Sequence, residues 1–480
     1  MISLTLAEIA KAINGKLING SQQETVINNI STDTRKIQSG DLFIALRGEH
    51  YDAHQFLDLA AQQGCAALLI EQPVVSELPC ILVQDTRVAL GLLGAYVRQQ
   101  IPHLKCAAIT GSNGKTTTKE LLSEILRNHV GKDVSNNVGP QESVLATAGN
   151  FNNDIGLPLT LLRLTEKVSY AVLELGANHA GEIAYTSKLA QPDVALINNV
   201  MPAHLEGFGS LQGVAKAKGE IWSSLGENGI AVVNVDANFA DDYLQQLQQL
   251  NRQYLTFSTT DSNAHIFASD IHFDLLGKAS FVVNALLDGR RQAINVQLNL
   301  PGLHNVSNAL AASAMAIALG CNLTDIQCGL AAAKQVGGRV NSCQVSELIT
   351  LIDDTYNANS ASVKAAIDLL LQYSTEHLLI LGDMAELGEF SDNEHALIGQ
   401  YAAQKGIQHL LTVGKLTLKT DQAYRQEGTG EAVHFSDKDQ VNTYLQGVLL
   451  QQNEKLTILV KGSRGSKMEE IVNFIKQSIQ

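Results

Sequence analysis

The 480-residue sequence is poor in charged residues, proline and cysteine. Charged residues make up 17% of the chain, below the ~25% that is usual in soluble domains. Apolar residues make up 45%, which is enough to fill several ordinary cores and excludes a disordered chain. The 8 prolines and 38 glycines favour turns without low-complexity segments. At roughly 150 residues per domain, this length predicts about three domains.

The six cysteines are scattered and contain no CxxC pair. This spacing favours neither a disulfide framework nor a cysteine-based metal site, so we expect reduced thiols in the cores. They are Cys65, Cys80, Cys106, Cys321, Cys328 and Cys343.

Basic residues are also scarce, because 34 Lys and Arg stand against 48 Asp and Glu, for a net charge of −14. This balance argues against a general nucleic-acid binder, which needs a basic surface, but allows small anions in a local pocket. The amino-terminal residues lack a basic region followed by an apolar run; they predict a capped amphipathic helix ending near Gly15 rather than a signal peptide. The alanine-rich stretch over 309–319 is too short to span a bilayer. We therefore expect a cytoplasmic protein.

What the sequence does contain is an alternation of short apolar runs, glycine- or asparagine-bearing turns and helical patterns. This alternation predicts α/β domains with parallel sheets flanked by helices. The region 264–300 differs and predicts antiparallel strands at 273–276, 280–286 and 293–300, with a hairpin turn at Asp288-Gly289. Other predicted strands cover 41–46, 66–70, 106–110, 170–175, 194–198, 230–234, 350–353, 378–381, 410–413 and 456–460, and predicted helices cover 56–63 and 306–319.

The alternation restarts after Gly337-Gly338, and a first block ends near residue 85. We therefore predict three domains, over residues 1–85, 86–336 and 337–480, with no internal repeat and no linker tail.

The strongest chemical signal is Gly111-Ser-Asn-Gly-Lys-Thr116, which leaves an apolar strand and enters a helix. Its glycines allow backbone N–H groups to surround phosphate oxygens, and the helix amino terminus adds partial positive charge. Lys115 would reach the β- and γ-phosphates, and the Thr116 hydroxyl would bind Mg²⁺. The loop is shorter than the general P-loop pattern, which has four residues between its glycines. The structural alternative is a glycine-rich turn followed by a chance Lys-Thr pair.

Two residues that follow apolar strands are candidate metal ligands. Glu174 ends the strand over 170–175, where a charge among apolar residues is costly unless it is paired or bound to metal. His204 follows the strand over 194–198. The alternatives, an exposed carboxylate and a structural loop histidine, stay open on spacing alone.

Together with motifs further along the chain, these features resemble the Mur ligase family, ATP-dependent amide-forming enzymes of peptidoglycan synthesis. The resemblance covers essentially the whole chain, and seven positions match in order. These positions are Lys115, Glu174, His204, Asn305, Asn308, Arg339 and Asp354. The motifs lie at 111–117, 173–176, 204–207, 215–221, 300–311, 338–339, 353–359 and 460–464.

Within the family, the chain is similar to the branch that joins D-alanyl-D-alanine to UDP-N-acetylmuramoyl-tripeptide. The stretches over 31–54, 149–158, 354–359 and 381–388 carry this similarity. It implies an amino-terminal domain for the UDP-linked precursor, a central P-loop-type ATPase domain with a mostly parallel sheet, and a carboxyl-terminal Rossmann-like domain that brings the dipeptide. The tripeptide carboxylate would form an acyl phosphate with ATP, which the dipeptide amine would then attack.

The resemblance also implies roles for residues around the nucleotide. Two Mg²⁺ ions would be held by Thr116, Glu174, His204 and a lysine carbamylated by CO₂, with Lys218 favoured over Lys216. The asparagines at 305 and 308 would recognise adenine; capping of the following helix is the alternative, and both can hold. Asp354 would contact the ribose, and Arg339 the phosphates. The predicted ATP-binding residues are Gly111, Ser112, Asn113, Gly114, Lys115, Thr116, Thr117, Asn305, Asn308, Arg339 and Asp354.

The resemblance also implies two groups of residues that contact the other substrates. The precursor would contact Arg35, Arg47, His54, Asn150 and Asn152, although a lone arginine beside a strand is usually just solvated. The dipeptide or a phosphate would contact Asn357, Asn359, Lys461, Ser463 and Arg464. The run 461–467 is predicted to open the last helix, so its amides could also bind an anion; a simple basic turn is the alternative.

The expected partners are small-molecule substrates, with no nucleic acid and no stable membrane insertion, and we expect a monomer. Rival interpretations are an earlier Mur ligase, a folylpolyglutamate-type ligase, or a P-loop switch NTPase. The third residue of the tripeptide, diaminopimelate or lysine, is left open.

Overall fold

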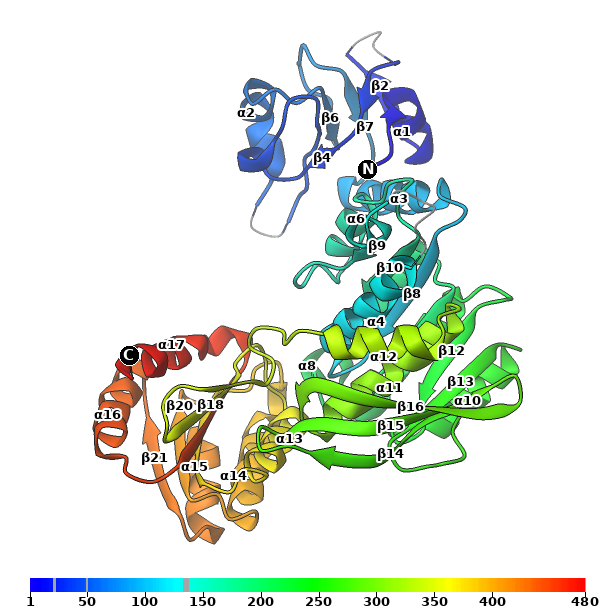
Figure 1. The fold of residues 1–480 in the computed structure, drawn as a ribbon. Coiled ribbons are helices and arrows are strands. Elements are labelled where there is room, and N and C mark those ends of the chain that lie inside the picture. The colour runs from blue at the N-terminus through cyan, green and yellow to red at the C-terminus, as the bar shows by residue number, and fades with distance from the viewer. Residues whose placement is uncertain (20–22, 49–50, 133–137, 480) are drawn as a thin grey trace.

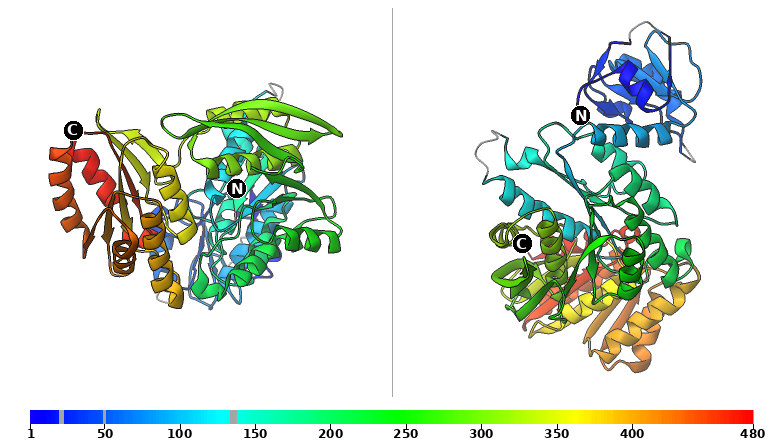
Figure 2. Two further views of the ribbon diagram at one scale, coloured as in Figure 1. Left: turned by 90° about the horizontal axis from the view of Figure 1, so that it is seen from below. Right: turned by 90° about the vertical axis from the view of Figure 1, so that its right-hand side faces the viewer.

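Three sheets follow one another along the chain in a computed structural model that describes residues 1–19, 23–48, 51–132 and 138–479 (Figure 1). The sheets have five, nine and six strands, and parallel pairs predominate in each. The predicted α/β class with mostly parallel sheets is confirmed. Figure 2 shows the first sheet as a separate unit at one end of the molecule.

Short helices accompany the first sheet, and the first of them has a capped amino terminus. In α1 (Leu6–Ala12), Thr5 and Glu8 form a reciprocal capping box, as the sequence predicts. The strand order is β2-β7-β6-β5-β4. The strands are β2 (Lys16–Ile18), β4 (Ile30–Ser31), β5 (Leu42–Ile44), β6 (Ala67–Ile70) and β7 (Cys80–Leu82), with α2 (Leu57–Gln62) alongside and a small pair β1 (Leu4–Thr5) and β3 (Val26–Ile27).

Helix α3 (Thr86–Gln99) joins the first sheet to the second. Asp85 caps it by accepting hydrogen bonds from the N–H groups of Arg87 and Val88. Its buried face, with Leu90 and Leu93, belongs to one hydrophobic core that reaches from the first sheet into the second. The first two units therefore share apolar packing around α3.

The second sheet has the order β16-β15-β14-β13-β12-β11-β8-β10-β9. Strand β8 (Lys105–Thr110) is third from the β9 edge and is buried on both faces: Cys106 and Ala108 pack into one core, Ala107 and Ile109 into another. The other strands are β9 (Val144–Ala146), β10 (Tyr170–Glu174), β11 (Val194–Ile197), β12 (Ile230–Asn234), β13 (Gln253–Ser258), β14 (Ile266–Phe273), β15 (Lys278–Leu287) and β16 (Arg290–Pro301).

The antiparallel part of this sheet is confirmed, but one predicted strand is wrong. Strands β14, β15 and β16 pair antiparallel, and Asp288 and Gly289 form the predicted hairpin turn with positive φ. The segment 273–276 is not a strand of its own: β14 ends at Phe273, and a turn follows. There the Asp274 carboxylate accepts hydrogen bonds from the N–H groups of Leu276 and Lys278.

Helices cover both faces of the second sheet, as the double burial of β8 requires (Figure 1). They are α4 (Lys115–Val130), α5 (Pro140–Ser143), α6 (Gly156–Leu161), α7 (Glu182–Ala190), α8 (Leu205–Phe208), α9 (Leu211–Gly219), α10 (Ala240–Gln249), α11 (Leu303–Ala318) and α12 (Leu323–Ala332).

The third sheet has the order β17-β18-β22-β19-β20-β21 and a separate core on each face. Its strands are β17 (Asn341–Gln344), β18 (Ile349–Asp354), β19 (Glu376–Gly382), β20 (His409–Val413), β21 (Glu431–Phe435) and β22 (Leu456–Lys461). Its helices are α13 (Ser360–Leu370), α14 (Ser391–Gln404), α15 (Leu418–Glu427), α16 (Lys438–Gln451) and α17 (Glu469–Ser478). Among the described residues, no helix is long and apolar enough to cross a membrane.

Candidate functional site

The predicted phosphate loop lies at the carboxyl end of β8, directly before α4. Gly111 and Gly114 have φ values of 153° and 78°, and Gly114 is the N-cap of α4. A side chain at Gly114 would collide with the amides of Asn198 and Asn308, so close packing also requires glycine there. The loop and helix amino terminus predicted from the sequence are therefore present.

Lys115 folds back onto this loop. Its Nζ donates hydrogen bonds to the carbonyl oxygens of Gly111, at 2.7 Å, and Ser112, at 3.3 Å. Burial lowers the pKa of Lys115, and the charge of Glu174 opposes that shift. The lysine thus points into the loop where a phosphate group would enter.

The segment after β11 forms the second wall of the loop. The Asn199 carbonyl accepts a hydrogen bond from the Ser112 N–H, and its side-chain oxygen accepts one from the Asn113 N–H at 2.9 Å. Asn198 donates to the Asn113 carbonyl and to the Asn308 side chain, each at 2.9 Å. Sequence reasoning missed both asparagines, because their place depends on the parallel pairing of β8 and β11.

Glu174 ends β10, the other neighbour of β8, and its side chain is 3% exposed. One carboxylate oxygen accepts a hydrogen bond from Thr116 Oγ1 at 2.8 Å, and the other accepts one from Asn152 Nδ2 at 2.9 Å. The alternative of an exposed carboxylate is therefore wrong. A buried acid beside a threonine hydroxyl is an oxygen donor pair that suits Mg²⁺.

A buried lysine is linked to the backbone of Glu174 through Thr147. Lys119, one turn beyond Lys115 on α4, donates from Nζ to the Thr147 carbonyl at 2.6 Å and is 1% exposed. The Thr147 hydroxyl in turn accepts a hydrogen bond from the Glu174 N–H at 3.0 Å. Lys119 was not predicted as a functional residue, although its spacing of four from Lys115 places both on one helix face.

The two candidate lysines on α9 differ sharply in burial. Lys218 is 3% exposed, whereas Lys216 is exposed. Burial lowers the pKa of the Lys218 ammonium well below its usual value, and the charge of Lys115 lowers it further. Lys218 is therefore the buried lysine of the two, and its surroundings shift the amine toward the uncharged form.

His204 lies between β11 and α8, with its Nδ1 2.5 Å from Glu386 Oε2 of the third-sheet unit. Its φ of 52° is in the left-handed region, which is uncommon for a residue other than glycine. The histidine thus lies at the boundary between the second and third sheets. Glu386 was not predicted as a site residue.

Asn305 and Asn308 are buried in the first two turns of α11. The Asn305 amide donates to the Pro301 carbonyl at 2.8 Å, and the Asn308 amide donates to Asn305 Oδ1 at 3.0 Å. The N-cap is Gly302 and has no side-chain hydrogen bond, so the predicted capping role is wrong. Asn308 instead connects α11 to the wall of the phosphate loop through Asn198.

Arg339 and Asp354 stand in the third-sheet unit. The Arg339 guanidinium lies over the Tyr356 ring, 3.9 Å from its centre. Asp354 is ion-paired at 2.5 Å with Lys461, which also donates to the Asn357 carbonyl at 2.9 Å and is only 2% exposed. Lys461 is therefore held inside this unit by its own neighbours.

The remaining residues predicted near the dipeptide bind other residues of the protein. Asn359 caps α13, and its amide exchanges two hydrogen bonds with Asn113 of the phosphate loop, at 2.7 and 3.2 Å. The Ser463 hydroxyl accepts a hydrogen bond from the Ala385 N–H at 2.8 Å, and exposed Arg464 pairs with Glu469 at 3.0 Å. The prediction that 461–467 opens the last helix is wrong, because α17 begins only at Glu469 after a separate short turn.

In the first-sheet unit, the predicted residues pair with local acids. Exposed Arg35 pairs with Asp33 at 2.8 Å. Arg47 lies 3.1 Å from Asp52, and His54 contacts the same carboxylate through Nδ1 at 2.6 Å.

The other two residues predicted to contact the precursor, Asn150 and Asn152, lie in the loop before α6. Asn150 is exposed, and Asn152 lies against Glu174 rather than the first-sheet unit. The structure adds a contact that sequence reasoning missed: Arg87, at the start of α3, binds Asp154 of the loop before α6 at 2.8 Å. That loop also carries Asn150 and Asn152, so this ion pair fixes it to the helix between the first two units.

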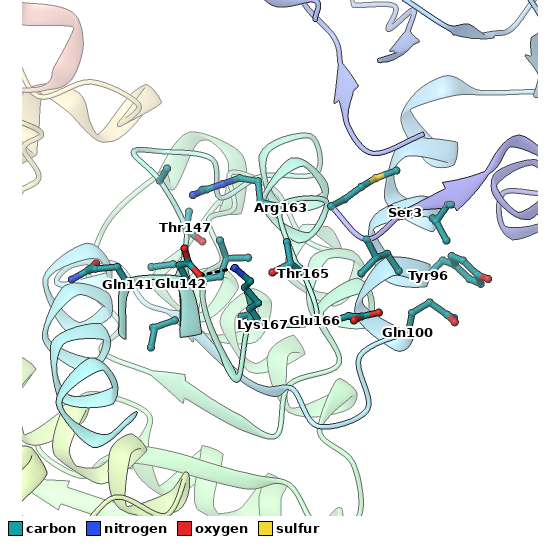
Figure 3. A pocket seen from close by; sticks show the side chains of 18 of the residues that line it. Ser3, Tyr96, Gln100, Gln141, Glu142, Thr147, Arg163, Thr165, Glu166 and Lys167 are labelled. Carbon is teal, nitrogen blue, oxygen red and sulfur yellow. Dashed lines mark hydrogen bonds and ion pairs between the residues drawn. The ribbon is translucent and has the colours of Figure 1, made fainter. Parts of the chain in front are cut away.

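A cavity of about 1100 Å³ lies on another side of α3 (Figure 3). Ser3, Tyr96 and Gln100 line it on one side, and Glu142 lies across from them. None of the predicted precursor-contacting residues is among its lining residues. One of its acids is already neutralised, because Glu142 pairs with Lys167 at 2.9 Å.

All six cysteines are free thiols, as predicted, but their predicted core position holds for only four. Cys328 is exposed and Cys343 is partly exposed. Cys321 lies near His129 and Asp325 in a group that could hold a metal ion. There the Asp325 carboxylate is already satisfied by His129 and Lys132, which lie 2.8 and 2.5 Å away.

Comparison with known proteins gives a consistent result across the whole chain. Residues 109–316 match the Mur ligase middle domain, and residues 338–464 match the Mur ligase, glutamate ligase domain. The UDP-N-acetylmuramoyl-tripeptide–D-alanyl-D-alanine ligase of Escherichia coli (strain K12) is 44% identical over 479 residues, covering 100% of this chain and 99% of that protein. Crystal structure I of MurF from Acinetobacter baumannii superposes with a TM-score of 0.90 at 37% identity and 99% coverage of both chains. MurF ligase from Thermotoga maritima in complex with ADP gives a TM-score of 0.79 at 26% identity, covering 94% of this chain and 97% of that chain.

Proposed function

The chain belongs to the Mur ligase family, and we propose that it joins D-alanyl-D-alanine to UDP-N-acetylmuramoyl-tripeptide in an ATP-dependent reaction. The terminal carboxylate of the tripeptide attacks the γ-phosphorus of ATP, so that an acyl phosphate forms and ADP leaves. The free amine of the dipeptide then attacks the acyl carbon, phosphate leaves, and the amine loses a proton. The product is the UDP-linked pentapeptide.

The main observation behind this proposal is the loop at the end of β8, where residues of the loop and of the start of α4 are hydrogen-bonded to segments that end or follow the two neighbouring strands. Lys115, the Thr116 hydroxyl and the Glu174 carboxylate converge there, and Thr116 contacts Glu174 directly. The first step brings two anions together, so neutralising and positioning charge is its central requirement. Lys115 supplies a cation, and the loop amides with the α4 amino terminus supply fixed dipoles for the phosphates.

The donor set also fits Mg²⁺. We assign Thr116 to one ion, and Glu174, His204 and carbamylated Lys218 to a second. Bound there, Mg²⁺ would neutralise phosphoryl charge and favour approach of the substrate carboxylate. The hydroxyl and carboxylate oxygens are hard ligands of the kind that Mg²⁺ prefers.

Carbamylation of Lys218 is supported by its surroundings. Only a neutral amine reacts with CO₂; a C–N bond forms, a proton is released, and the product is an anionic carbamate. Burial and the Lys115 charge both favour the neutral amine at Lys218, whereas exposed Lys216 has no such bias. A buried carbamate would also need a nearby cation, and the Lys115 charge supplies one.

We also assign contacts to the adenine, the ribose and the phosphates of ATP. Asn305 and Asn308 would face adenine, Asp354 the ribose and Arg339 the phosphates. Asp354 could keep its ion pair with Lys461 while its second oxygen accepts from a hydroxyl, because a carboxylate accepts several hydrogen bonds. The Arg339 Nε has no hydrogen-bond partner among the described residues, so the guanidinium can still donate to an anion.

We assign the precursor to the unit over residues 1–85, ATP to residues 86–336, and the dipeptide to residues 337–480. The candidate precursor contacts are Arg35, Arg47, His54, Asn150 and Asn152. Asn357, Asn359, Lys461, Ser463 and Arg464 are the candidates for the dipeptide or phosphate side. We further propose that the enzyme works as a cytoplasmic monomer. The full-length match, which includes the first-sheet unit, does not favour a folylpolyglutamate-type ligase.

A phosphate-release assay tests the proposal. Release should require both UDP-N-acetylmuramoyl-tripeptide and D-alanyl-D-alanine, and single amino acids should not replace the dipeptide. A comparison of tripeptides with diaminopimelate or lysine at the third position decides the precursor. Nucleotide hydrolysis with neither substrate present would instead favour a switch NTPase.

A further inference from the structure

We propose that Glu386, supplied by the third-sheet unit, is a positioning residue that orients His204 for metal binding. This inference rests on the proposed function, because it takes His204 as a ligand of Mg²⁺. It adds a residue outside the ligand set and joins the dipeptide-binding unit to the metal site of the ATP-binding unit.

The direct contact is between one carboxylate and one ring nitrogen. His204 Nδ1 lies 2.5 Å from Glu386 Oε2, so the opposite nitrogen, Nε2, is left for another partner. Metal-bound histidines usually donate their second N–H to a carboxylate or carbonyl, which fixes the tautomer and the ring orientation. His204 and Glu386 show the same pairing of a ring nitrogen with a carboxylate, here as an ion-pair contact at 2.5 Å rather than as a hydrogen bond.

Both residues also have an uncommon backbone conformation, which eleven non-glycine residues of the described chain share. His204 and Glu386 have φ values of 52° and 63°, both in the left-handed region although neither is glycine. Such conformations cost on the order of 1–3 kcal/mol and persist where surrounding structure enforces them, often at functional sites. Here two such residues, from different units, face each other.

The loop that carries Glu386 is held firmly on the third-sheet side. The Asp383 carboxylate accepts hydrogen bonds from the N–H groups of Leu416 and Thr417, at 3.0 and 2.9 Å. The Met384 N–H donates to His395 Nε2 at 3.0 Å, and the Ala385 N–H donates to the Ser463 hydroxyl at 2.8 Å. Three consecutive residues before Glu386 are thus fixed, which aims its side chain.

The same loop meets the His204 segment through the backbone. The Glu206 N–H lies 3.5 Å from the Glu386 carbonyl. Gly388, with φ of 54°, lets the loop approach Glu206 so closely that an added Cβ would come within 3.3 Å of its Cβ. Docking of the third-sheet unit therefore brings Glu386 to His204, and the histidine is fully oriented only when this unit is docked.

The experiment compares Glu386→Ala, Glu386→Gln and the matched control Glu389→Gln, each with His204→Ala. Glu389 is an exposed acid three residues further along the same loop. Mn²⁺ affinity is measured by electron paramagnetic resonance with a non-hydrolysable ATP analogue. The tautomer of His204 is followed by its ring ¹⁵N chemical shifts, and the melting temperature reports folding.

We expect Glu386→Ala to weaken Mn²⁺ binding by about 10- to 100-fold, the scale for losing a carboxylate behind a histidine ligand. The Glu386→Gln change should lose less, because its amide oxygen still accepts from Nδ1–H. Glu389→Gln should bind as the unmodified protein does. In the His204→Ala background, Glu386→Ala should add no further loss.

Two results would overturn the inference separately from the ligase assignment. If His204→Ala weakens Mn²⁺ binding but Glu386→Ala changes neither the affinity nor the ¹⁵N shifts, the contact is incidental. If His204→Ala leaves Mn²⁺ binding intact, His204 is not a ligand and the positioning role falls with it. Neither result alters the test of phosphate release with both substrates.

Discussion

The phosphate-loop site and the candidate residues of the first sheet are built in opposite ways. At the phosphate loop, contacts join distant parts of the chain: Thr116 meets Glu174, 58 residues away, and Asn198 meets Asn308, 110 residues away. In the first-sheet unit, Arg35 pairs with Asp33, two residues away. The first site is therefore tied to several elements of the fold, whereas Arg35 pairs within its own short turn. Function at the loop should therefore be lost steeply on substitution.

The largest effect is expected for Lys115→Ala. Loss of one preorganised charge at a phosphoryl-transfer site costs on the order of 10²–10³ in rate. Steady-state phosphate release should fall at least this far, while calorimetric binding of the tripeptide precursor stays unchanged. Turnover at the rate of the unmodified enzyme would remove the phosphate loop from the account.

Lys218→Ala should come next, with a loss of roughly 10²-fold in phosphate release, because it removes one electrostatic group of the same site. Lys216→Ala is its matched control on the same helix and should leave the rate unchanged, since its side chain is exposed. Equal rates for both variants would exclude a carbamate at Lys218. Intact-mass measurement of the native protein under CO₂ gives an independent readout.

The buried ion pair between Lys461 and Asp354 joins distant parts of the chain and should contribute to folding stability. Lys461→Met leaves Asp354 without its ion-pair partner, and breaking such a pair costs about 3–5 kcal/mol in unfolding free energy. Chemical denaturation measures this directly. The control Lys455→Met, at an exposed position before the same strand, should change the unfolding free energy little.

The smallest effect is expected for Arg35→Ala. The Arg35 guanidinium holds the pKa of Asp33 at about 2, so removing it should raise that pKa toward its ordinary value. A carboxyl with a lowered folded-state pKa adds stability above its ordinary pKa and loses it as the pH falls toward 2. Both groups are solvent-accessible, so this contribution is screened and the melting temperature at neutral pH should fall only slightly. An NMR titration of Asp33 measures the change, and an unaltered pKa would show that the pair does not form in solution.

The sequence predicted the parts of this site that follow local patterns. The loop after β8, the carboxylate ending β10 and the helix α4 each arise from contiguous residues. The choice of Lys218 over Lys216 came from the family resemblance, and burial now supports it physically.

The parts that were missed or wrong depend on pairing between distant segments. Asn198 and Asn199 reach the loop only because β11 pairs with β8, and Glu386 meets His204 only through docking of the third sheet. Capping by Asn305 and Asn308 was wrong because Gly302 occupies the N-cap, one turn earlier than the predicted helix start. Neither the strand order nor the docking of the third sheet can be predicted from the sequence of a single segment.

The central claim is that this loop forms an acyl phosphate on the tripeptide carboxylate. The direct measurement uses precursor labelled with ¹⁸O in both oxygens of that carboxylate, with ATP and D-alanyl-D-alanine, and analyses the products by mass spectrometry. One ¹⁸O should appear in the released phosphate and one should remain in the new amide carbonyl. Phosphate that carries no label from the carboxylate would contradict the account.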